Sequence, residues 1–406
     1  MRKINTRNFR RATRSTSREI NRQIVLNLVR EHQPVSRADL ARLMNVGRGM
    51  VTSLVNELIA EGIIYEGATG VSRRGRRPKL LHLRTNDRFV VAIDVRFSRT
   101  YVMLADFSGR QIALETFETR FDPGALIDEL ARRARRLLAN HAAEGRCHGI
   151  GLVVPGMVDR RTGRVLNAPQ LGWRDVDVRD ALAAATGLPV YIENAPHACA
   201  LAQMWLAPSG SEVVDNFVYV TVSDGVGAGV VLHGEIVRGH SDTAGEFGHI
   251  PLSLDGPRCL CGRRGCWEAY TSNLATLARY LRYDLSRPDA WERLKESPLT
   301  VPELIARARV GDQRARAALE ETARYLGIGL AGIMNALNPA RIFIGGEITE
   351  AWDLLADTVR RAAAERVLTA AAAATPIIPE EAGGYPRLRG ATALVVAPMF
   401  AAPRLG

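Results

Sequence analysis

Residues 245–270 read G-E-F-G-H-I-P-L-S-L-D-G-P-R-C-L-C-G-R-R-G-C-W-E-A-Y. The stretch holds three of the five cysteines of the chain, one histidine and two glutamates within 23 positions. Residue types that ligate metals therefore alternate with carboxylates that suit hydrogen bonding to a polar ligand. We interpret the stretch as one site with two tasks, around which the rest of the chain is organised.

Four residues of this stretch have the composition and spacing of a closed metal site. Cys259 and Cys261 form a Cys-x-Cys pair, Cys266 follows five residues later, and His249 precedes the pair by ten. Three thiolates and one imidazole suit tetrahedral Zn²⁺. The alternatives are a disulfide, or three small buried thiols beside a surface histidine. Zinc is favoured because nothing marks the chain as secreted, and clustered cytosolic thiols are more often metal ligands.

The glutamates and cysteines also form one composite pattern, G-E-F-G-H followed by C-x-C-G-x-x-G-C-x-E. This pattern resembles the signature of the ROK family, whose members are sugar kinases and sugar-responsive transcriptional repressors. Further family-like segments occur at residues 153–173, 192–195, 223–230 and 338–346. The resemblance therefore covers nearly the whole chain.

Length and composition favour a globular protein of several domains. The 406 residues exceed one ordinary core, so two or three domains are expected. The hydrophobic share of 47% and the charged share of 24% are ordinary for a globular chain. No apolar segment follows the basic start, and no uncharged run reaches membrane-spanning length. We expect a soluble, cytoplasmic protein without a membrane partner.

The net charge of +11 lies in the first fifth of the chain. Residues 1–88 contain 19 basic and 7 acidic residues, whereas the remainder is almost neutral. A basic segment attached to a neutral body is typical of a nucleic-acid-binding module. The first 15 residues are interpreted as a flexible basic arm, with a plain solvated tail as the alternative.

Three helices are predicted in the basic segment. Thr16-x-x-Glu19 is a capping-box pattern that opens the first helix, and Ser36-x-x-Asp39 opens the second. Residues 45–47, Asn-Val-Gly, supply a turn, and a third helix then ends at Gly62. Three short helices with a tight turn before the last predict a helix-turn-helix.

The third helix has a polar face that suits contact with base edges and phosphates. It is the predicted recognition helix, and the alternative is a plain solvated face. The residues on this face are Arg48, Gly49, Thr52, Ser53 and Asn56.

A basic loop between two short predicted strands completes a winged helix. The strands are 63–65 and 80–83, and the loop resembles the G-R-P core of minor-groove hooks. Arginines inserted into a narrow minor groove respond to its width. DNA contact is favoured over a merely soluble linker. The cations predicted to bind DNA from this loop are Arg73, Arg74, Arg76, Arg77 and Lys79.

From residue 89 the pattern changes to strands and helices of an α/β domain. Strands are predicted at 90–95, 101–106, 111–119 and 149–154, with a helix at 123–143, which favours a mixed sheet. The resemblance implies a two-lobed actin-like (ribonuclease-H-like) sugar-kinase fold with its ligand between the lobes. The predicted domains are the winged helix-turn-helix at 1–86, a first lobe at 87–194 joined by a C-terminal helix at 391–406, and a second lobe at 195–390.

The resemblance also assigns the sugar contacts. Backbone of one glycine and the side chains of four polar residues would bind the sugar hydroxyls, and the histidine would use one ring nitrogen for the metal and the other for the sugar. A site of this kind discriminates strongly, because a missing hydroxyl leaves buried polar groups unpaired. The assigned residues are Gly156, Asn194, Glu246, His249 and Glu268.

Two of three requirements for sugar phosphorylation are missing. The D-x-G-G-T type of hairpin, whose backbone N–H groups bind ATP phosphates, is replaced by residues 94–98, D-V-R-F-S. Ala195 stands where the family's kinases have the aspartate that acts as general base. The third requirement, the phosphate loop D-G-V-G-A-G at 224–229, is retained, although tight turns keep glycine without ATP as well.

The sequence therefore predicts a sugar-responsive transcription factor that acts as a repressor and is not an enzyme. Its expected partners are operator DNA, a sugar effector and a second or further copies of the chain, as a homodimer or homotetramer. One alternative is an active sugar kinase with a DNA-binding appendage, which Ala195 argues against. Another is a DNA-binding scaffold with a vestigial cleft, which the intact glutamates argue against.

Overall fold

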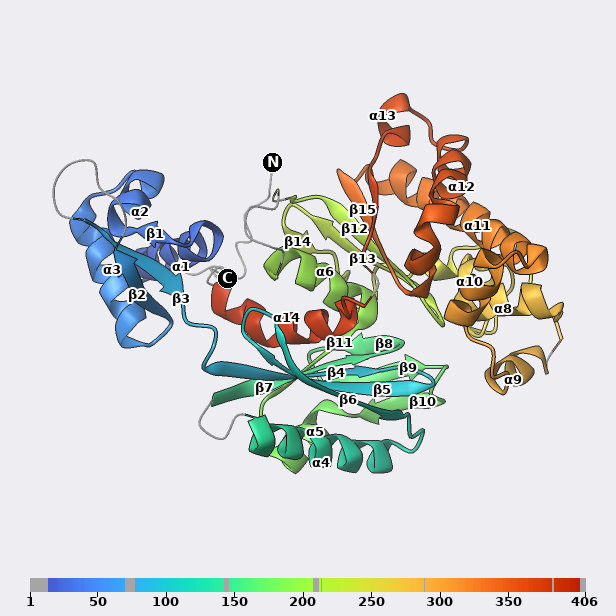
Figure 1. Ribbon diagram of the computed structural model, residues 1–406, viewed down its shortest axis with the longest axis horizontal. Helices are drawn as coiled ribbons and strands as arrows, with labels where there is room; N and C mark the ends of the chain where they lie inside the picture. Colours follow the sequence, from blue (N-terminus) through green and yellow to red (C-terminus); the bar gives the residue numbers. More distant parts are fainter. Residues whose placement is uncertain are drawn as a thin grey trace.

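The N-terminal module consists of three helices and a small sheet (Figure 1). In the computed structural model the described residues are 14–69, 77–141, 146–206, 212, 214–287, 289–381 and 383–401. The module comprises α1 (Arg14–His32), β1 (Val35–Ser36), α2 (Arg37–Met44), α3 (Arg48–Ala60), β2 (Ile64–Thr69) and β3 (Lys79–Leu83), with the sheet order β1-β3-β2. This is the element order predicted for a winged helix. Residues 1–13 of the predicted basic arm and most of the wing loop lie outside the described residues, whereas Arg14 and Ser15 of that arm belong to α1.

Local sequence signals account for these helix boundaries. The capping box predicted at Ser36 and Asp39 is formed in both directions at the start of α2. Asn45 ends that helix in the left-handed conformation (φ 51°), and Gly62 follows α3 with φ 68°. The prediction that Thr16 and Glu19 open the first helix is wrong, because α1 already begins at Arg14 and Thr16 lies inside it.

The first lobe is a five-stranded mixed sheet in the order β11-β7-β4-β5-β6. Its strands are β4 (Arg88–Val95), β5 (Arg99–Asp106), β6 (Gln111–Glu118), β7 (Arg146–Val154) and β11 (Val190–Asn194). Helices α4 (Pro123–His141) and α5 (Arg179–Thr186) lie on one face (Figure 1). A small sheet of β8 (Met157–Asp159), β9 (Arg164–Ala168) and β10 (Trp173–Asp177) adjoins it.

The opposite face of this sheet carries α14 (Pro386–Phe400) and the helix α6 (Ala195–Trp205) (Figure 1). The side chains of β4 alternate accordingly: Val91 and Ile93 join the α4 core, and Ala92 joins the α14 core. Gly151 is required here, because a Cβ would overlap the Ala391 carbonyl. The C-terminal helix was predicted to begin at residue 391, but it begins five residues earlier.

The second lobe is built on the sheet β14-β13-β12-β15-β16. Its strands are β12 (Phe217–Val222), β13 (Val226–Leu232), β14 (Glu235–Ile236), β15 (Arg341–Gly345) and β16 (Ile377–Pro379). Helical segments pack on it: η1 (Phe247–His249), α7 (Glu268–Thr271), α8 (Asn273–Leu281), α9 (Ala290–Lys295), α10 (Val301–Arg309), α11 (Gln313–Leu337), η2 (Glu347–Ala351), α12 (Trp352–Ala364) and α13 (Ala370–Ala373).

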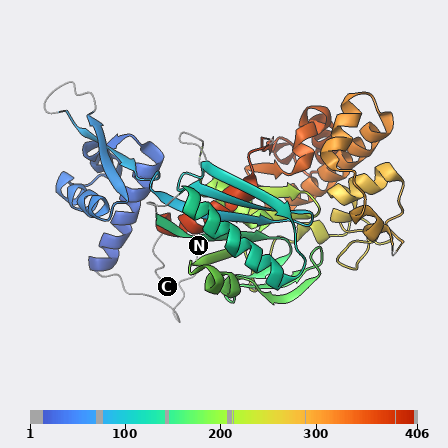
Figure 2. The ribbon, with the colours of Figure 1, turned by 60° about the horizontal axis from the view of Figure 1, so that its bottom comes forward.

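The module and the helices of the second lobe lie at opposite ends of the molecule, in both views (Figures 1 and 2). The first lobe, α6 and α14 lie between them. Among the described residues, no helix is both long and apolar enough to cross a membrane.

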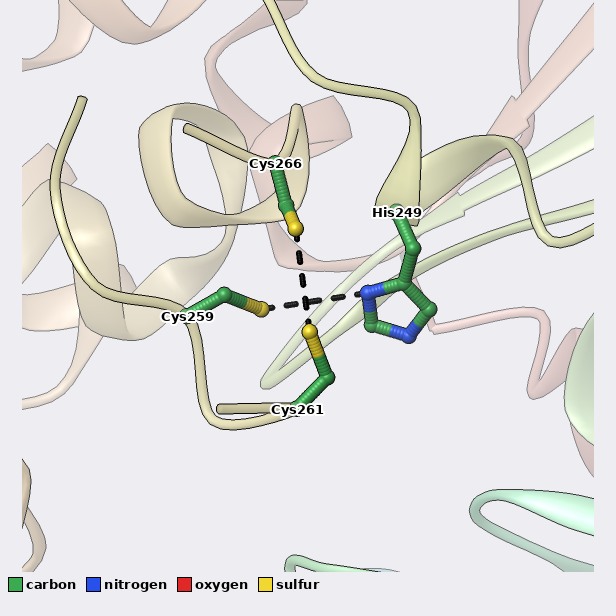
Figure 3. Close-up of side chains that lie close together, drawn as sticks. All are labelled: His249, Cys259, Cys261 and Cys266. Carbon is green, nitrogen blue, oxygen red and sulfur yellow. Dashed lines mark hydrogen bonds between the residues drawn. The ribbon is translucent and has the colours of Figure 1, made fainter. Parts of the chain in front are cut away.

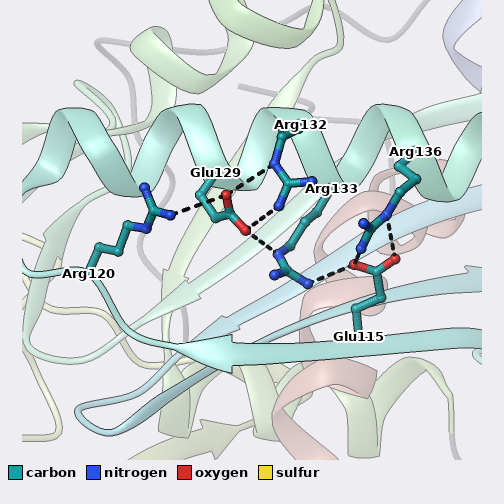
Figure 4. Close-up of polar contacts among 6 residues, drawn as sticks. All are labelled: Glu115, Arg120, Glu129, Arg132, Arg133 and Arg136. Carbon is teal, nitrogen blue, oxygen red and sulfur yellow. Dashed lines mark hydrogen bonds and ion pairs between the residues drawn. The ribbon is translucent and has the colours of Figure 1, made fainter.

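A charge cluster fastens α4 to the edge strand β6 (Figure 4). Glu129 on α4 is buried and lies 2.5 Å from Arg132 and 2.6 Å from Arg133, and Arg133 also lies 2.9 Å from Glu115 on β6. The hydrogen bonds from Arg132, with the charge of Arg133, outweigh burial and lower the pKa of Glu129 to about 2. The cluster places charged side chains along the edge strand β6, and charge on an edge strand opposes pairing with another sheet.

We expect Glu129→Gln to lower thermal stability in a pH-dependent way. The pKa of Glu129 lies below its usual 4.5 in the folded state, so its ionised form stabilises the fold above about pH 4.5, and this contribution disappears as pH falls towards 2. The melting temperature of the variant, measured by circular dichroism, should fall below that of wild type at pH 7 and approach it near pH 2.5. The exposed Glu118 provides a control as Glu118→Gln; an equal deficit at both pH values would contradict the assignment.

Candidate functional site

The four predicted metal ligands converge on one point (Figure 3). The ligand atoms of His249, Cys259, Cys261 and Cys266 all lie within 4.8 Å of one another. The Cys261 and Cys266 sulfurs are 3.7 Å apart, and the Cys259 sulfur lies 3.8 Å from His249 Nδ1. Bonds of about 2.3 Å to a tetrahedral ion give an edge of about 3.8 Å between ligands. The arrangement therefore fits a metal site.

The disulfide alternative is wrong. All five cysteines are free, and the sulfur–sulfur distance of 3.7 Å is far above the roughly 2.05 Å of a disulfide bond. The alternative of small buried hydrophobes is also disfavoured by geometry, because the half-buried Cys261 points its sulfur at the other ligands (Figure 3).

Glycines allow the loop to fold tightly around this cluster. Gly265 has φ 70°, and a Cβ there would overlap the Ser253 carbonyl. Isolated bridges pair Pro251 with Cys266 and Arg258 with Arg264 across the loop. The two glycines of C-G-R-R-G-C thus serve the turn that brings the third cysteine back to the first two.

The cluster is continuous with two carboxylates of the cleft. While Nδ1 of His249 faces the sulfurs, its Nε2 lies 3.8 Å from Glu246 Oε2. The Cys259 sulfur lies 3.3 Å from Glu268 Oε1, and Glu268 Oε2 accepts a hydrogen bond of 2.9 Å from the Val226 N–H. A metal in the cluster would therefore fix the orientation of both glutamates.

All five residues that sequence analysis assigned to sugar line a single cavity between the lobes. The cavity measures about 830 Å³ including its solvent-open part. It is lined by Gly156, Asn194, Glu246, His249 and Glu268, by Asp224 of the retained loop at 224–229, and in addition by Gln170 and Thr221, which sequence reasoning did not assign to the site. Gln170 lies beside Glu268, since a Cβ on Gly225 would meet both side chains within 2.9 Å.

Asn194 has two roles at the end of β11. Its side-chain oxygen accepts a hydrogen bond of 3.1 Å from the His197 N–H and so caps α6, which leaves the amide NH₂ for a ligand. Behind it, Glu193 is buried beside His197, Arg238 and Arg160. Burial alone would raise the pKa of Glu193, but His197 and the two guanidinium groups outweigh it and lower the pKa to about 2.

At residue 195, where the family's kinases are expected to have the general base, the structure places no other proton acceptor. Ala195 lines the cavity, but the buried His197 is not among the lining residues and packs against Glu193. No carboxylate replaces the methyl group at residue 195.

An arginine stands in the turn where sequence analysis expects a kinase to have a glycine-rich hairpin. Arg96, in the turn after β4, lies 2.6 Å from the buried Asp94 and 3.1 Å from Glu347 at the start of η2, so it links the two lobes. Arg387 of α14 lies 3.8 Å from Asp94. Burial and the charge of Glu347 raise the pKa of Asp224 in the adjoining loop to about 6. The sequence showed that the turn after Asp94 lacks glycine, but it did not predict the ion pairs by which Arg96 connects the two lobes.

On α3 the five predicted DNA-contacting residues are all exposed. Two cations from neighbouring elements, which sequence reasoning missed, lie beside them. Arg18 on α1 donates a hydrogen bond of 2.9 Å to Ser53, and Arg37 on α2 donates one of 3.0 Å to Asn56. The spacing of apolar and polar residues within α3 cannot predict either contact, because both arginines come from other helices.

The wing is only partly described. Arg77 is exposed, whereas Arg73, Arg74 and Arg76 lie outside the described residues. Lys79 forms an ion pair of 2.8 Å with Glu66, which also contacts Arg37. The described base of the wing is thereby tied to α2.

The two α/β lobes around a polar cleft, preceded by a basic helix-turn-helix module, define a ligand-binding protein with a DNA-binding type of appendage. The chain belongs to the ROK family, which it matches over residues 90–397. It is 28% identical to the xylose repressor of Bacillus subtilis over 384 residues, which cover 93% of this chain and 95% of that protein.

Two further similarities represent the two branches of the family. The crystal structure of a ROK family transcriptional regulator, a homologue of the E. coli MLC protein, superposes with a TM-score of 0.77 at 26% identity and covers 95% of this chain and 97% of that one. A glucokinase of Halalkalibacterium halodurans is 32% identical over 68% of this chain and 85% of its own length. The regulators match both the module and the lobes, whereas the kinase matches a shorter part.

We expect Arg96→Ala to destabilise the protein, because it leaves the buried Asp94 carboxylate with only a distant guanidinium. Removing one partner of a buried ion pair costs about 3 kcal/mol. Urea unfolding should show this loss, and the double variant Arg96→Ala/Asp94→Asn should recover part of it. A single variant as stable as wild type would show that the bridge contributes nothing to the fold.

Proposed function

We propose that this protein is a transcriptional repressor whose affinity for operator DNA is controlled by a sugar bound between its lobes. The observation that carries the proposal is the single cavity that collects Asn194, Glu246, His249 and Glu268 in a chain that also bears a basic helix-turn-helix module. The near full-length similarity to a protein named xylose repressor supports it.

The chemistry of the cavity suits a sugar. Carboxylates accept pairs of hydrogen bonds from vicinal hydroxyls, and the Asn194 amide donates in return. The sugar contacts that we propose are Glu246, His249, Glu268 and Asn194 with the backbone of Gly156. A glycine is required there, because φ is 89° and a Cβ would overlap the Asn167 carbonyl oxygen. Gln170 and Thr221, on either side of the cleft, join this set as further polar groups.

We further propose that the cleft binds its sugar without phosphorylating it. Phosphoryl transfer needs a base at the acceptor hydroxyl and backbone donors around the phosphates. Ala195 offers no base, and the Arg96 bridge occupies the phosphate end. The alternative, an active kinase with a DNA-binding appendage, draws support from similarities to sugar kinases that cover a shorter part of the chain.

The cluster of His249, Cys259, Cys261 and Cys266 is proposed to bind Zn²⁺. A bound zinc ion would be structural, since four protein ligands leave no open position. The ion would hold His249 and Cys259 in place. His249 and Glu268, which contacts the Cys259 sulfur, would thereby keep their orientation toward the cleft.

DNA contacts are proposed for the exposed face of α3 and for the wing. The face comprises Arg48, Thr52, Ser53 and Asn56, with Arg18 and Arg37 beside it to approach phosphates. Symmetric operators are commonly bound by symmetric dimers, so we propose a homodimer or homotetramer acting in the cytoplasm. The predicted boundaries near residues 86 and 194 are retained as proposed domain limits.

We expect purified protein to contain about one zinc per chain by elemental analysis. Cys261→Ser should lower both the metal content and the melting temperature, because a structural metal couples binding to folding. Cys147→Ser, which changes a free cysteine outside the cluster, is the matched control. Metal-free wild type that stays fully folded and binds sugar would refute the zinc assignment.

Glu268→Gln tests the cleft as the sensor. A glutamine keeps one acceptor for the Val226 N–H but removes charge and acceptor capacity from the ligand side. We expect unchanged operator affinity and zinc content, but at least tenfold weaker sugar affinity in calorimetry, and a matching rise in the sugar needed for DNA release. Glu235→Gln, at an exposed position on β14, is the control.

Two results would contradict the proposed function. If Glu268→Gln responds to sugar as wild type does, the cleft is not the sensor. If wild type forms a phosphorylated sugar from ATP above the background of a protein-free control, the kinase alternative holds.

A further inference from the structure

Helix α6 has one end in the sugar cleft and the other at the DNA-binding module. Asn194 caps its N-terminus and lines the cavity, and Trp205 is its last residue. The helix spans 11 residues, or about 16 Å at the usual rise per residue. One helix thus connects Asn194, a proposed sugar-binding residue, to the DNA-binding module.

At its far end Trp205 meets α1 of the module. The guanidinium of Arg30 lies 4.8 Å from the centre of the Trp205 ring and 5.4 Å from that of Phe400. These two rings are stacked, with centroids 6.5 Å apart and planes at 24°. A cation above two stacked aromatic rings is a directional contact, worth about 1 kcal/mol or more when sheltered from water.

Helix α14 runs beside α6 between the same two places. Arg387 in its first turn lines the cleft, and Phe400 ends it at the module. At Gly390 a Cβ would lie 2.5 Å from the Ala198 carbonyl carbon, so the two helices are in closest approach. Close-packed helices of this kind shift together and not separately.

Module helix α1 is also fixed to the end of α14. The Gln23 side chain donates hydrogen bonds to the carbonyls of Met399 (2.5 Å) and Ala401 (2.9 Å), and Asn27 donates one of 2.8 Å to Phe400. A displacement of the α6–α14 pair is therefore passed to α1, and from α1 to α3, which shares its apolar core.

The junction is not solidly filled. A cavity of about 780 Å³, open to solvent, is lined by Arg30, Trp205, Phe400, Phe107 and Arg84 among others. The Arg30 Nε is buried without a hydrogen-bond partner, while the Nη2 atom of the same group donates a hydrogen bond of 3.1 Å to Glu31. The cavity gives the guanidinium space, and the Nε gives it unused donor capacity, for a second position of the kind that a switch requires.

We propose that Trp205 and Arg30 are positioning residues that transmit sugar binding from the cleft to the DNA-binding module. Neither residue belongs to the cavity lining at the sugar or to the exposed face of α3. Sugar acts on Asn194 and Arg387 at one end of the helix pair, and the Arg30–Trp205 contact changes at the other. This inference rests on the proposed function and names the route by which it is regulated.

The test measures the coupling factor, which is the ratio of operator dissociation constants with and without saturating sugar. The operator is a duplex selected from a random library by wild-type protein, and the sugar is the tightest ligand among D-xylose, D-glucose and N-acetylglucosamine by calorimetry. Affinities are measured by fluorescence anisotropy. Typical coupling factors are roughly 5–150.

We expect Trp205→Ala and Arg30→Gln each to keep the operator affinity without sugar, and the sugar affinity without DNA, within about threefold of wild type, while the coupling factor falls towards one. The double variant should lose no more coupling than either single variant, because both act through one contact. Trp352→Ala, a tryptophan of α12 in the second lobe, is the matched control and should keep the wild-type factor.

Each other outcome has a defined meaning. If the wild-type protein has a coupling factor of one, or binds neither DNA nor sugar, the proposed function itself is wrong. If Trp205→Ala is folded and its coupling factor equals that of wild type, only the inference is wrong. Should Trp205→Ala unfold, Arg30→Gln, which keeps the aromatic packing, decides: unchanged coupling there overturns the inference.

Discussion

The closing of one loop around four nitrogen and sulfur ligands is the constraint on which the rest of the site depends. The same 20-odd residues that bring His249 and Cys259 together place Glu246 and Glu268 at the cleft, through contacts of 3.8 and 3.3 Å. Three thiolates beside two carboxylates would repel one another strongly at low dielectric. The proposed divalent cation would offset that repulsion, so the charge that holds the loop would also stabilise the buried Glu268 and the half-buried Glu246 beside it.

At the opposite end of the cleft, buried negative charge is offset by an arginine side chain instead of the proposed metal ion. The buried Asp94 and the nearby Glu347 are two negative charges at low dielectric, and Arg96 offsets both from within the chain. A bulky cation in this turn fills space between the lobes, and the ion pairs of Arg96 hold the first lobe to η2 of the second. The proposed absence of phosphoryl transfer and the stability of the two-lobed body would thus both draw on the same arginine.

Much of this architecture could be predicted from local signals, and the remainder could not, for physical reasons. Capping boxes and glycines act within a few residues, so the module helices and the cysteine loop were predictable. Contacts such as Arg37 with Asn56, or Arg96 with Glu347, join distant parts of the chain and leave no periodic trace. The start of α14 was misplaced by five residues, and the Gly390 left out of the prediction is what allows the helix to touch Ala198, a contact with a distant part of the chain.

The way the module is attached limits how an effector can act. Its apolar core is continuous with Val90 and Phe107 of the first lobe and with Val395 and Phe400 of α14, so the module is packed against the body and not merely tethered to it. A sugar cannot release it without exposing that core, which would cost more than the roughly 1–3 kcal/mol typical of allosteric coupling. The economical change is a small rotation at the polar and aromatic junction. Because the exposed face of α3 lies away from that junction, a shift of an ångström at the junction would become a larger displacement at the proposed DNA-contacting face.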